Sequence, residues 1–226
     1  MIKKIYNKLH IFHSIYIKQN FFKKKISYSL DGEDIVVKDF FNEKKEGIYI
    51  DIGCFHPLRM NNTQLLHMKG WSGINVDVSE FAIDLFNHAR PNDLNYHCAV
   101  SDKNEIIKLY FEKKQSPLTT SKIDHAKKYF NDKINEKKIE AFSLDEIIER
   151  GKFKNTKIDF LDIDVEGSDL NVLKGLSFDK FQPKLVCVEI HAKEIKKSDI
   201  YNFLVDKNYE LFWSGTFSHI FKRLEN

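Results

Sequence analysis

Ionisable side chains gather at the ends of two apolar runs in this sequence. The run D-I-D-V-E-G covers residues 162–167, and the run L-V-C-V-E-I-H covers residues 185–191. Acids in apolar surroundings are unfavourable unless they are paired or bind a ligand. If both runs are parallel strands, their carboxyl ends meet at the edge of the sheet where ligands bind. Four side chains are then expected to converge and to accept protons or bind a cation: Asp164, Glu166, Glu189 and His191.

A second group of residues predicts a nucleotide pocket. The run Gly47–Ile52 reads as a buried strand with Asp51 near its end, and Gly73–Val78 reads as a second strand containing Asp77, 26 residues after Asp51. A β-α-β unit of this kind builds a nucleotide site at the carboxyl edge of a parallel sheet. We expect Asp77 to bind ribose hydroxyls.

The loop after the first strand limits the kind of nucleotide. It has a single glycine, Gly53, followed by Cys54, Phe55 and His56, so it lacks the G-x-G-x-x-G pattern that lets a pyrophosphate approach the backbone. A phosphate-binding Walker loop is absent as well. A phosphate-free adenosyl compound such as S-adenosylmethionine needs neither. The alternative is that Asp51 and Gly53 only shape a turn.

Strands and helices alternate along the rest of the chain. Strands are also expected at 94–100, 106–112, 158–165 and 185–191, helices at 61–69, 81–89, 144–150, 170–176 and 199–207, and a terminal hairpin at 209–222. Alternation of this kind predicts an α/β fold with a Rossmann-like, doubly wound sheet that is mostly parallel. The closing hairpin adds a C-terminal antiparallel strand, as in class I methyltransferases.

The bulk composition fits one soluble domain. The chain has 226 residues, of which 42% are hydrophobic and 31% charged, with three cysteines in apolar runs. These values favour a single domain at 29–226 and reduced thiols in a cytoplasmic setting. No apolar run approaches the ~20 residues that cross a bilayer. The polar segment 113–138 is expected to be an inserted loop with a short helix that covers the substrate.

Residues 1–28 form a basic arm. No Asp or Glu occurs before Asp31, whereas seven lysines do. The arm is either a helix packed on the domain or on a partner subunit, or a segment that contacts an anionic membrane surface. Basic residues form no stripe elsewhere, so we expect no nucleic-acid partner. The sequence leaves the oligomeric state open.

Most of the chain resembles the FkbM-type methyltransferases. The resemblance rests on S-x-x-G-E-D at 29–34, Y-I-D-I-G at 49–53, N-T at 62–63, G-W-x-G at 70–73, R-P at 90–91, the run 158–167 and V-L-x-G at 172–175. It implies a Rossmann-like fold, S-adenosylmethionine as donor and O-methylation, often of a sugar in a glycan or natural product. Two departures are Leu30, where a polar residue is expected, and Asp77, where Glu is commoner.

The resemblance also suggests roles at the cofactor. Asp51 and Gly53 are expected at its methionine end, and Val78 beside its adenine. Ser101 and Asp102 are expected at the adenine edge, or else form an ordinary turn. Glu33 faces the cofactor's ammonium group, or else only supplies negative charge to the first turn of a helix.

The acid cluster has two candidate roles in methyl transfer. We expect His191 to be the general base, because the usual pKa of histidine suits that role at neutral pH, with Asp164 and Glu189 positioning the substrate. Alternatively, Asp164, Glu189 and another acid bind Mg²⁺, and His191 is structural. His56 and Glu166 are predicted substrate contacts.

Two other classes of protein remain open from the sequence. One is a metal-dependent hydrolase that uses Asp162, Asp164 and Glu166. The other is a non-catalytic adenosyl-binding module.

Overall fold

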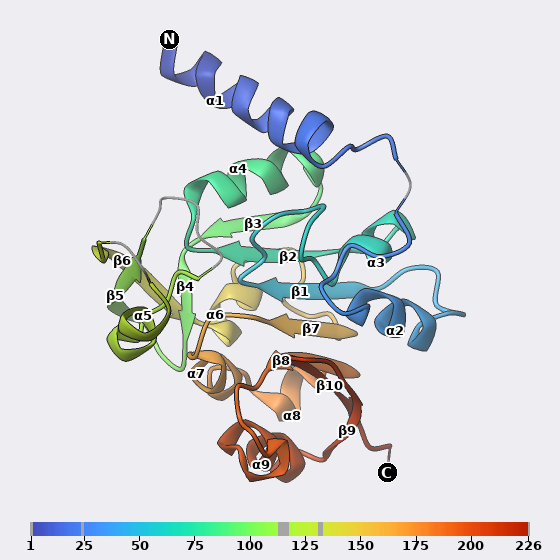
Figure 1. The fold of residues 1–226 in the computed structure, drawn as a ribbon. Coiled ribbons are helices and arrows are strands. Elements are labelled where there is room, and N and C mark those ends of the chain that lie inside the picture. The colour runs from blue at the N-terminus through green and yellow to red at the C-terminus, as the bar shows by residue number, and fades with distance from the viewer. Residues whose placement is uncertain (1, 24, 113–117, 131–132, 226) are drawn as a thin grey trace.

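A seven-stranded sheet forms the centre of the molecule (Figure 1). The computed structural model describes residues 2–23, 25–112, 118–130 and 133–225. The strands are β1 Ile48–Ile52, β2 Ser72–Asp77, β3 Leu94–His97, β7 Phe160–Ile163, β8 Leu185–Glu189, β9 Tyr209–Ser214 and β10 Ser218–Arg223. Their order across the sheet is β3-β2-β1-β7-β8-β10-β9.

The strand directions confirm the predicted fold class. The first five strands in this order pair in parallel, whereas β10 is antiparallel to both β8 and β9. The last strand of the chain is therefore inserted between two earlier ones. This is the Rossmann-like, mostly parallel sheet with a C-terminal antiparallel strand that the sequence predicts.

Helices cover both faces of this sheet. Ile50 and Ile52 of β1 pack in a core with side chains of α6, α7 and α9, whereas Tyr49 packs on the opposite face with side chains of α2 and α3. The helices are α2 Glu33–Phe40, α3 Gln64–Met68, α4 Glu80–Ala89, α6 Leu144–Glu149, α7 Asp169–Lys174, α8 Phe178–Phe181 and α9 Asp199–Asp206, with a 3-10 turn, η2, at Ile195–Lys197. Because alternate β1 residues serve the two cores, the sheet is doubly wound.

A second, three-stranded sheet corrects two sequence predictions. Its order is β4-β6-β5, with β4 Ala99–Ser101, β5 Glu105–Phe111 and β6 Asn135–Ser143. The strand predicted at 94–100 is two strands in different sheets. The end of the predicted insertion is also part of β6, where the exposed side chains of Glu136, Lys138 and Glu140 alternate with partly buried ones and give a weak apolar signal. Backbone pairing on both edges holds this strand in place.

The rest of the insertion contains the predicted short helix, α5 Ile123–Tyr129. Residues 113–117 and 131–132 lie outside the described residues. The expectation that the segment covers the substrate therefore stays a prediction.

The N-terminal arm forms α1 Ile2–Phe12 and a π-helical turn, η1, at His13–Lys18. It lies across α4 (Figure 1), where Ile15 is buried and packs with Leu85. The division of the chain at residue 28 stays a prediction. Within the described part of the chain, no helix is long and apolar enough to cross a bilayer.

Candidate active site

A tight turn at Gly53 opens the carboxyl edge of the sheet. Gly53 has φ +82°, and a Cβ at this position would overlap the main-chain carbonyl of Asp164. The Gly53 amide donates to the carbonyl of Val76 on the neighbouring strand at 2.9 Å. Only glycine satisfies both the left-handed conformation and the close approach. The chain therefore turns away here and leaves space above β1 and β2.

A first cavity occupies this space. It encloses about 610 Å³, including its open mouth, and its wall contains Gly53, Asp77 and Val78. Several apolar side chains complete the wall, among them Val76, Cys98, Val100, Ile107 and Leu109. An apolar slot beside a carboxylate suits a flat heterocycle joined to a polar sugar.

Asp77 is held in place by the backbone. Its two carboxylate oxygens accept hydrogen bonds from the amides of Phe55, at 2.8 Å, and Ser79, at 2.7 Å. Burial raises its pKa, and these two hydrogen bonds oppose that rise. Each oxygen keeps a second lone pair for a ligand hydroxyl, so the fixed carboxylate can bind a ribose diol.

A second cavity gathers the predicted catalytic residues. It encloses about 860 Å³, including its mouth. Asp164, Glu166, Glu189 and His191 all line it, together with His125 and Tyr129 from α5. Asp164 also lines the first cavity, so the two cavities adjoin at this residue. β7 and β8 end at Ile163 and Glu189, which places Asp164, Glu166 and His191 on the loops beyond the strands.

Glu189 and His191 form a close pair in this cavity. Oε2 of Glu189 lies 2.8 Å from Nε2 of His191. Burial, together with the carboxylates of Glu166 and Asp169, raises the pKa of Glu189 to about 8. Burial and Lys128 lower the pKa of His191 below its usual 6.5, so its imidazole is neutral at pH 7. A neutral imidazole facing the cavity can accept a proton.

Glu166 is fixed by an unusual turn. It has φ +53° and precedes Gly167 at φ +91°. The Asp169 carboxylate accepts from the amides of Val165 and Gly167, both at 3.1 Å. Thr120 donates its hydroxyl to the Glu166 carbonyl at 2.7 Å. Burial, followed by Asp164 and Asp169, raises the pKa of Glu166 to about 8. The turn thus places the Glu166 side chain at the cavity, and the hydrogen bond from Thr120 connects Glu166 to the segment that leads to α5.

Comparison with known proteins identifies the family. A family model described as the methyltransferase FkbM domain matches residues 51–211. The chain belongs to the FkbM methyltransferase family. It is therefore an S-adenosylmethionine-dependent methyltransferase, as the motifs at 49–53 and 158–167 predict.

The other comparisons add little to this assignment. A comparison with curated proteins finds no match. Among solved structures, a TehB-like SAM-dependent methyltransferase from Corynebacterium glutamicum is 11% identical with a TM-score of 0.43, over 98% of this chain and 100% of that one. The assignment rests on the family model.

Four residues predicted at the cofactor of this FkbM enzyme lie outside the first cavity. Asp51 is buried behind the Gly53 turn, where it accepts from Asn61 Nδ2 at 2.9 Å and Thr63 Oγ1 at 2.8 Å. The Ser101 hydroxyl lies 3.2 Å from an Asp102 carboxylate oxygen. Glu33 lines the second cavity instead. Their cofactor roles stay predictions.

His56, a predicted substrate contact, lies beneath the N-terminal arm. Its Nε2 is 3.2 Å from the Ser14 hydroxyl, and its Nδ1 accepts from the Leu58 amide at 3.0 Å. Burial, followed by the charge of Arg59, lowers its pKa to about 4. It lines neither cavity, and its substrate role stays a prediction.

Arg90, a buried residue at the end of α4, has a role that sequence reasoning missed. It donates to Thr63 Oγ1 at 2.8 Å, and to Asn61 Oδ1 and Gln64 Oε1 at 2.9 Å each. Asn61 and Thr63 in turn donate to Asp51. Arg90 therefore supports the loop that carries Gly53. The R-P pair at 90–91 belongs to the family pattern, and it is the only sequence signal for this role.

Three carboxylates in the second cavity, from Asp164, Glu166 and Glu189, can hold a cation. One ligand oxygen from each lies within 4.8 Å of the others. Oxygen ligands of this kind suit Mg²⁺. The magnesium site at Asp164 and Glu189 stays a prediction.

Proposed function

We propose that this FkbM enzyme methylates a sugar hydroxyl in the assembly of a surface glycan or natural product. The observation that carries the proposal is that Asp164 borders both cavities. A methyl donor in the first cavity can then present its methyl group to an acceptor in the second.

The first cavity fits the adenosyl part of S-adenosylmethionine. Asp77 binds the ribose hydroxyls, Val78 and the β5 side chains cover the adenine, and Gly53 lets the ligand approach the backbone. When bound, S-adenosylmethionine supplies a methyl group on a sulfonium, which an oxygen nucleophile displaces in line. The protein's main task is alignment of the acceptor oxygen with that methyl group.

The second cavity fits a sugar. Asp164, Glu166 and Glu189 supply acceptors for several hydroxyl groups, and Tyr129 and Phe217 supply rings for the apolar face of a sugar. Asp164 and Glu189 hold the acceptor, and its hydroxyl proton passes to Nε2 of His191 as the new O–CH₃ bond forms.

The three cysteines are free and buried, which supports a reducing, cytoplasmic location. The acceptor is therefore proposed to be a precursor that is available inside the cell.

Two assays test the proposal. In thermal shift, S-adenosylhomocysteine at about 100 times its Kd should stabilise the protein by about 2.7 kcal/mol. Incubation with methyl-labelled donor and a panel of sugars and sugar nucleotides should then give a labelled methyl ether. No stabilisation by S-adenosylhomocysteine would refute the adenosyl site. Stabilisation by divalent metal alone would favour the hydrolase, and cofactor binding with label on no sugar would refute the acceptor class.

A further inference from the structure

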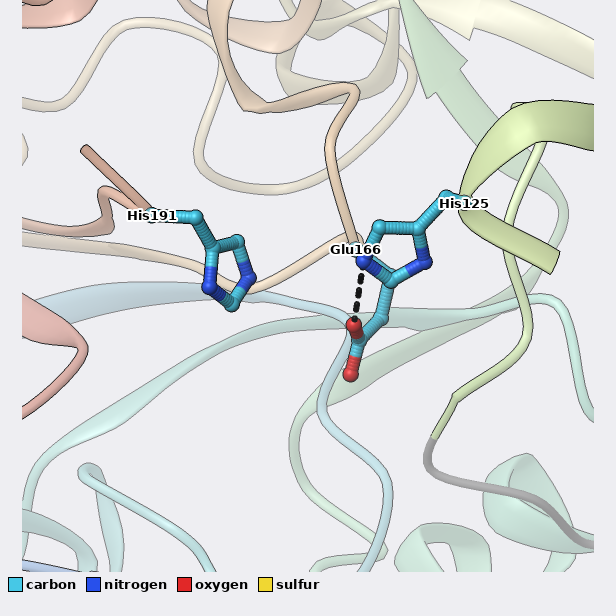
Figure 2. Close-up of side chains that lie close together, drawn as sticks. All are labelled: His125, Glu166 and His191. Carbon is cyan, nitrogen blue, oxygen red and sulfur yellow. Dashed lines mark ion pairs between the residues drawn. The ribbon is translucent and has the colours of Figure 1, made fainter. Parts of the chain in front are cut away.

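Two imidazoles and a carboxylate meet in the second cavity (Figure 2). His125 comes from α5, Glu166 from the loop after β7 and His191 from the loop after β8. One ligand atom from each lies within 4.8 Å of the other two. Nε2 of His125 is 3.6 Å from Oε2 of Glu166, and the His191 ring faces the same space (Figure 2).

Buried polar atoms around this space lack hydrogen bonds. Among the described residues, both ring nitrogens of His125 and Oε2 of Glu189 are shielded from solvent without a well-formed hydrogen bond. Such groups are rare in folded proteins, and they often mark the place where an ion binds. A cation between the histidines and the carboxylates would bind one ring nitrogen of His125 and offset the repulsion among Asp164, Glu166 and Glu189.

We propose that His125, Glu166 and His191 bind a first-row transition-metal dication such as Zn²⁺ or Mn²⁺. Imidazole ligands favour these metals over Mg²⁺, which prefers an all-oxygen shell. Two histidines and one glutamate are also a ligand set of catalytic zinc sites that leave a position open for substrate. The 2.8 Å between His191 Nε2 and Glu189 Oε2 places a further carboxylate beside the ion. This ligand set differs from the magnesium set of Asp164 and Glu189.

The ion would deepen the proposed function, on which its role rests. It would bind the acceptor oxygen at its open position and lower the pKa of that hydroxyl. A dication beside Glu189 would favour the ionised form of its carboxyl group, so with His191 Nε2 bound to the metal the proton would pass to the Glu189 carboxylate instead. Because His125 belongs to the 113–138 segment, the ion would also tie α5 to the loops at the ends of β7 and β8.

Metal binding can be measured without activity. Protein stripped with EDTA is titrated calorimetrically with Zn²⁺, Mn²⁺ and Mg²⁺, and the metal content of the purified protein is determined by mass spectrometry. One Zn²⁺ or Mn²⁺ per chain is expected, with affinity about 100-fold lower in His125→Ala and in Glu166→Gln, because each substitution removes a ligand. The exposed His88, on α4, supplies the matched control His88→Ala, which should bind normally.

Three outcomes would overturn the site. In the first, the wild type binds no transition metal. In the second, it binds Mg²⁺ alone. In the third, His125→Ala binds the transition metal with full affinity. Stabilisation of each variant by S-adenosylhomocysteine shows that it is folded, because His125 does not line the first cavity. Stabilisation of the metal-free protein by S-adenosylhomocysteine also tests the proposed function separately from metal binding.

A different observation concerns the outer face of the N-terminal arm. Ile5, Leu9 and Phe12 lie on one stripe of α1, and 53%, 62% and 53% of their surfaces are exposed. The opposite side of α1 packs against α4, since Asn7 donates to Asp84 at 2.7 Å and the His10 ring stacks on Phe81. Further large apolar side chains are exposed along the arm: Tyr6, Ile17, Phe21, Phe22 and Ile26.

We infer that this outer face docks on an anionic lipid surface. Residues 1–30 carry seven lysines and no acid, so their charge complements anionic headgroups while the apolar side chains enter the interface. A second copy is a poorer partner for the same face, because two basic arms would repel each other.

Vesicle co-sedimentation tests this inference. The protein should pellet with vesicles of phosphatidylcholine and phosphatidylserine but not with phosphatidylcholine alone, and high salt should weaken binding. Leu9→Ser with Phe22→Ser should abolish binding, whereas Val205→Ser, at an exposed apolar position on α9, should not. No binding to the anionic vesicles would refute the inference, as would a dimer in solution that the double variant disperses.

Discussion

Gly53 and Asp164 meet at the carboxyl ends of β1 and β7, where the Asp164 carbonyl fills the position of the missing Gly53 side chain. Asp164 also lines both cavities, and Gly53 lines the first. The chemistry of Asp164 and the conformation of Gly53 are therefore linked.

Gly53→Ala should lower stability and abolish cofactor binding. The variant must relieve both the overlap with Asp164 and a left-handed backbone, which alone costs about 1–3 kcal/mol. Gly32→Ala is the matched control, because Gly32 has φ +92° but no atom within 4 Å of the added Cβ. Thermal melts with and without S-adenosylhomocysteine measure both effects. Equal behaviour of the two variants would show that the overlap is unimportant.

Asp77→Ala should weaken binding of S-adenosylhomocysteine about 10- to 100-fold, the usual effect of removing a hydrogen bond to a charged group. Calorimetric titration measures the change. The control Asp206→Ala, at an exposed position on α9, should bind normally. Unchanged affinity in Asp77→Ala would remove the ribose role.

Arg90→Met should destabilise the protein by about 3–5 kcal/mol, because it leaves buried polar partners without their cation. The exposed Arg59 gives the control Arg59→Met, which should change stability little. Urea unfolding measures both. A small effect at Arg90 would mean that the loop holds its shape without the guanidinium.

Asp51 should make stability depend on pH. Burial raises its pKa from 3.8 to about 6, although Arg90, Thr63 and Asn61 oppose the rise. A carboxyl whose folded pKa is raised stabilises the fold fully below pH ~4, and this contribution is lost as the pH rises through ~6. Asp51→Asn should therefore show a smaller fall in melting temperature between pH 4 and 6.5 than the wild type. The exposed substitution Asp179→Asn should retain the wild-type slope, and an equal slope in Asp51→Asn would contradict the prediction.

His191→Ala should lower kcat about 10²- to 10⁴-fold, the usual contribution of a general base, and leave binding of S-adenosylhomocysteine unchanged. His88→Ala is again the control. Full activity in His191→Ala would exclude His191 as base, and full activity of the wild type in EDTA would exclude a required metal.

The sequence predicted the parallel sheet well because Gly47–Ile52 and Leu185–His191 are apolar on both faces, as buried parallel strands must be. The convergence of Asp164, Glu189 and His191 followed from the same reasoning, since strand ends share one edge. The small sheet was predicted less well. Glu136, Lys138 and Glu140 are exposed along β6, and its pairing depends on residues far away in the chain.

Two features of the site could not be read from the chain. Arg90 acts through Asn61, Thr63 and Gln64, all more than 25 residues away, and no local pattern reveals such a network. His125 lies in a polar, weakly periodic segment, so its approach to Glu166 depends on how α5 docks.

The placement of β10 has a consequence for how the molecule is made. Among the described strands, β9 pairs within the large sheet only through β10, so β9 has no partner in the sheet until β10 has been synthesised. The ribosome must release residues 218–223 before β8 and β9 can be bridged. Phe217, which lines the second cavity, directly precedes β10, so it reaches its position when β10 is inserted.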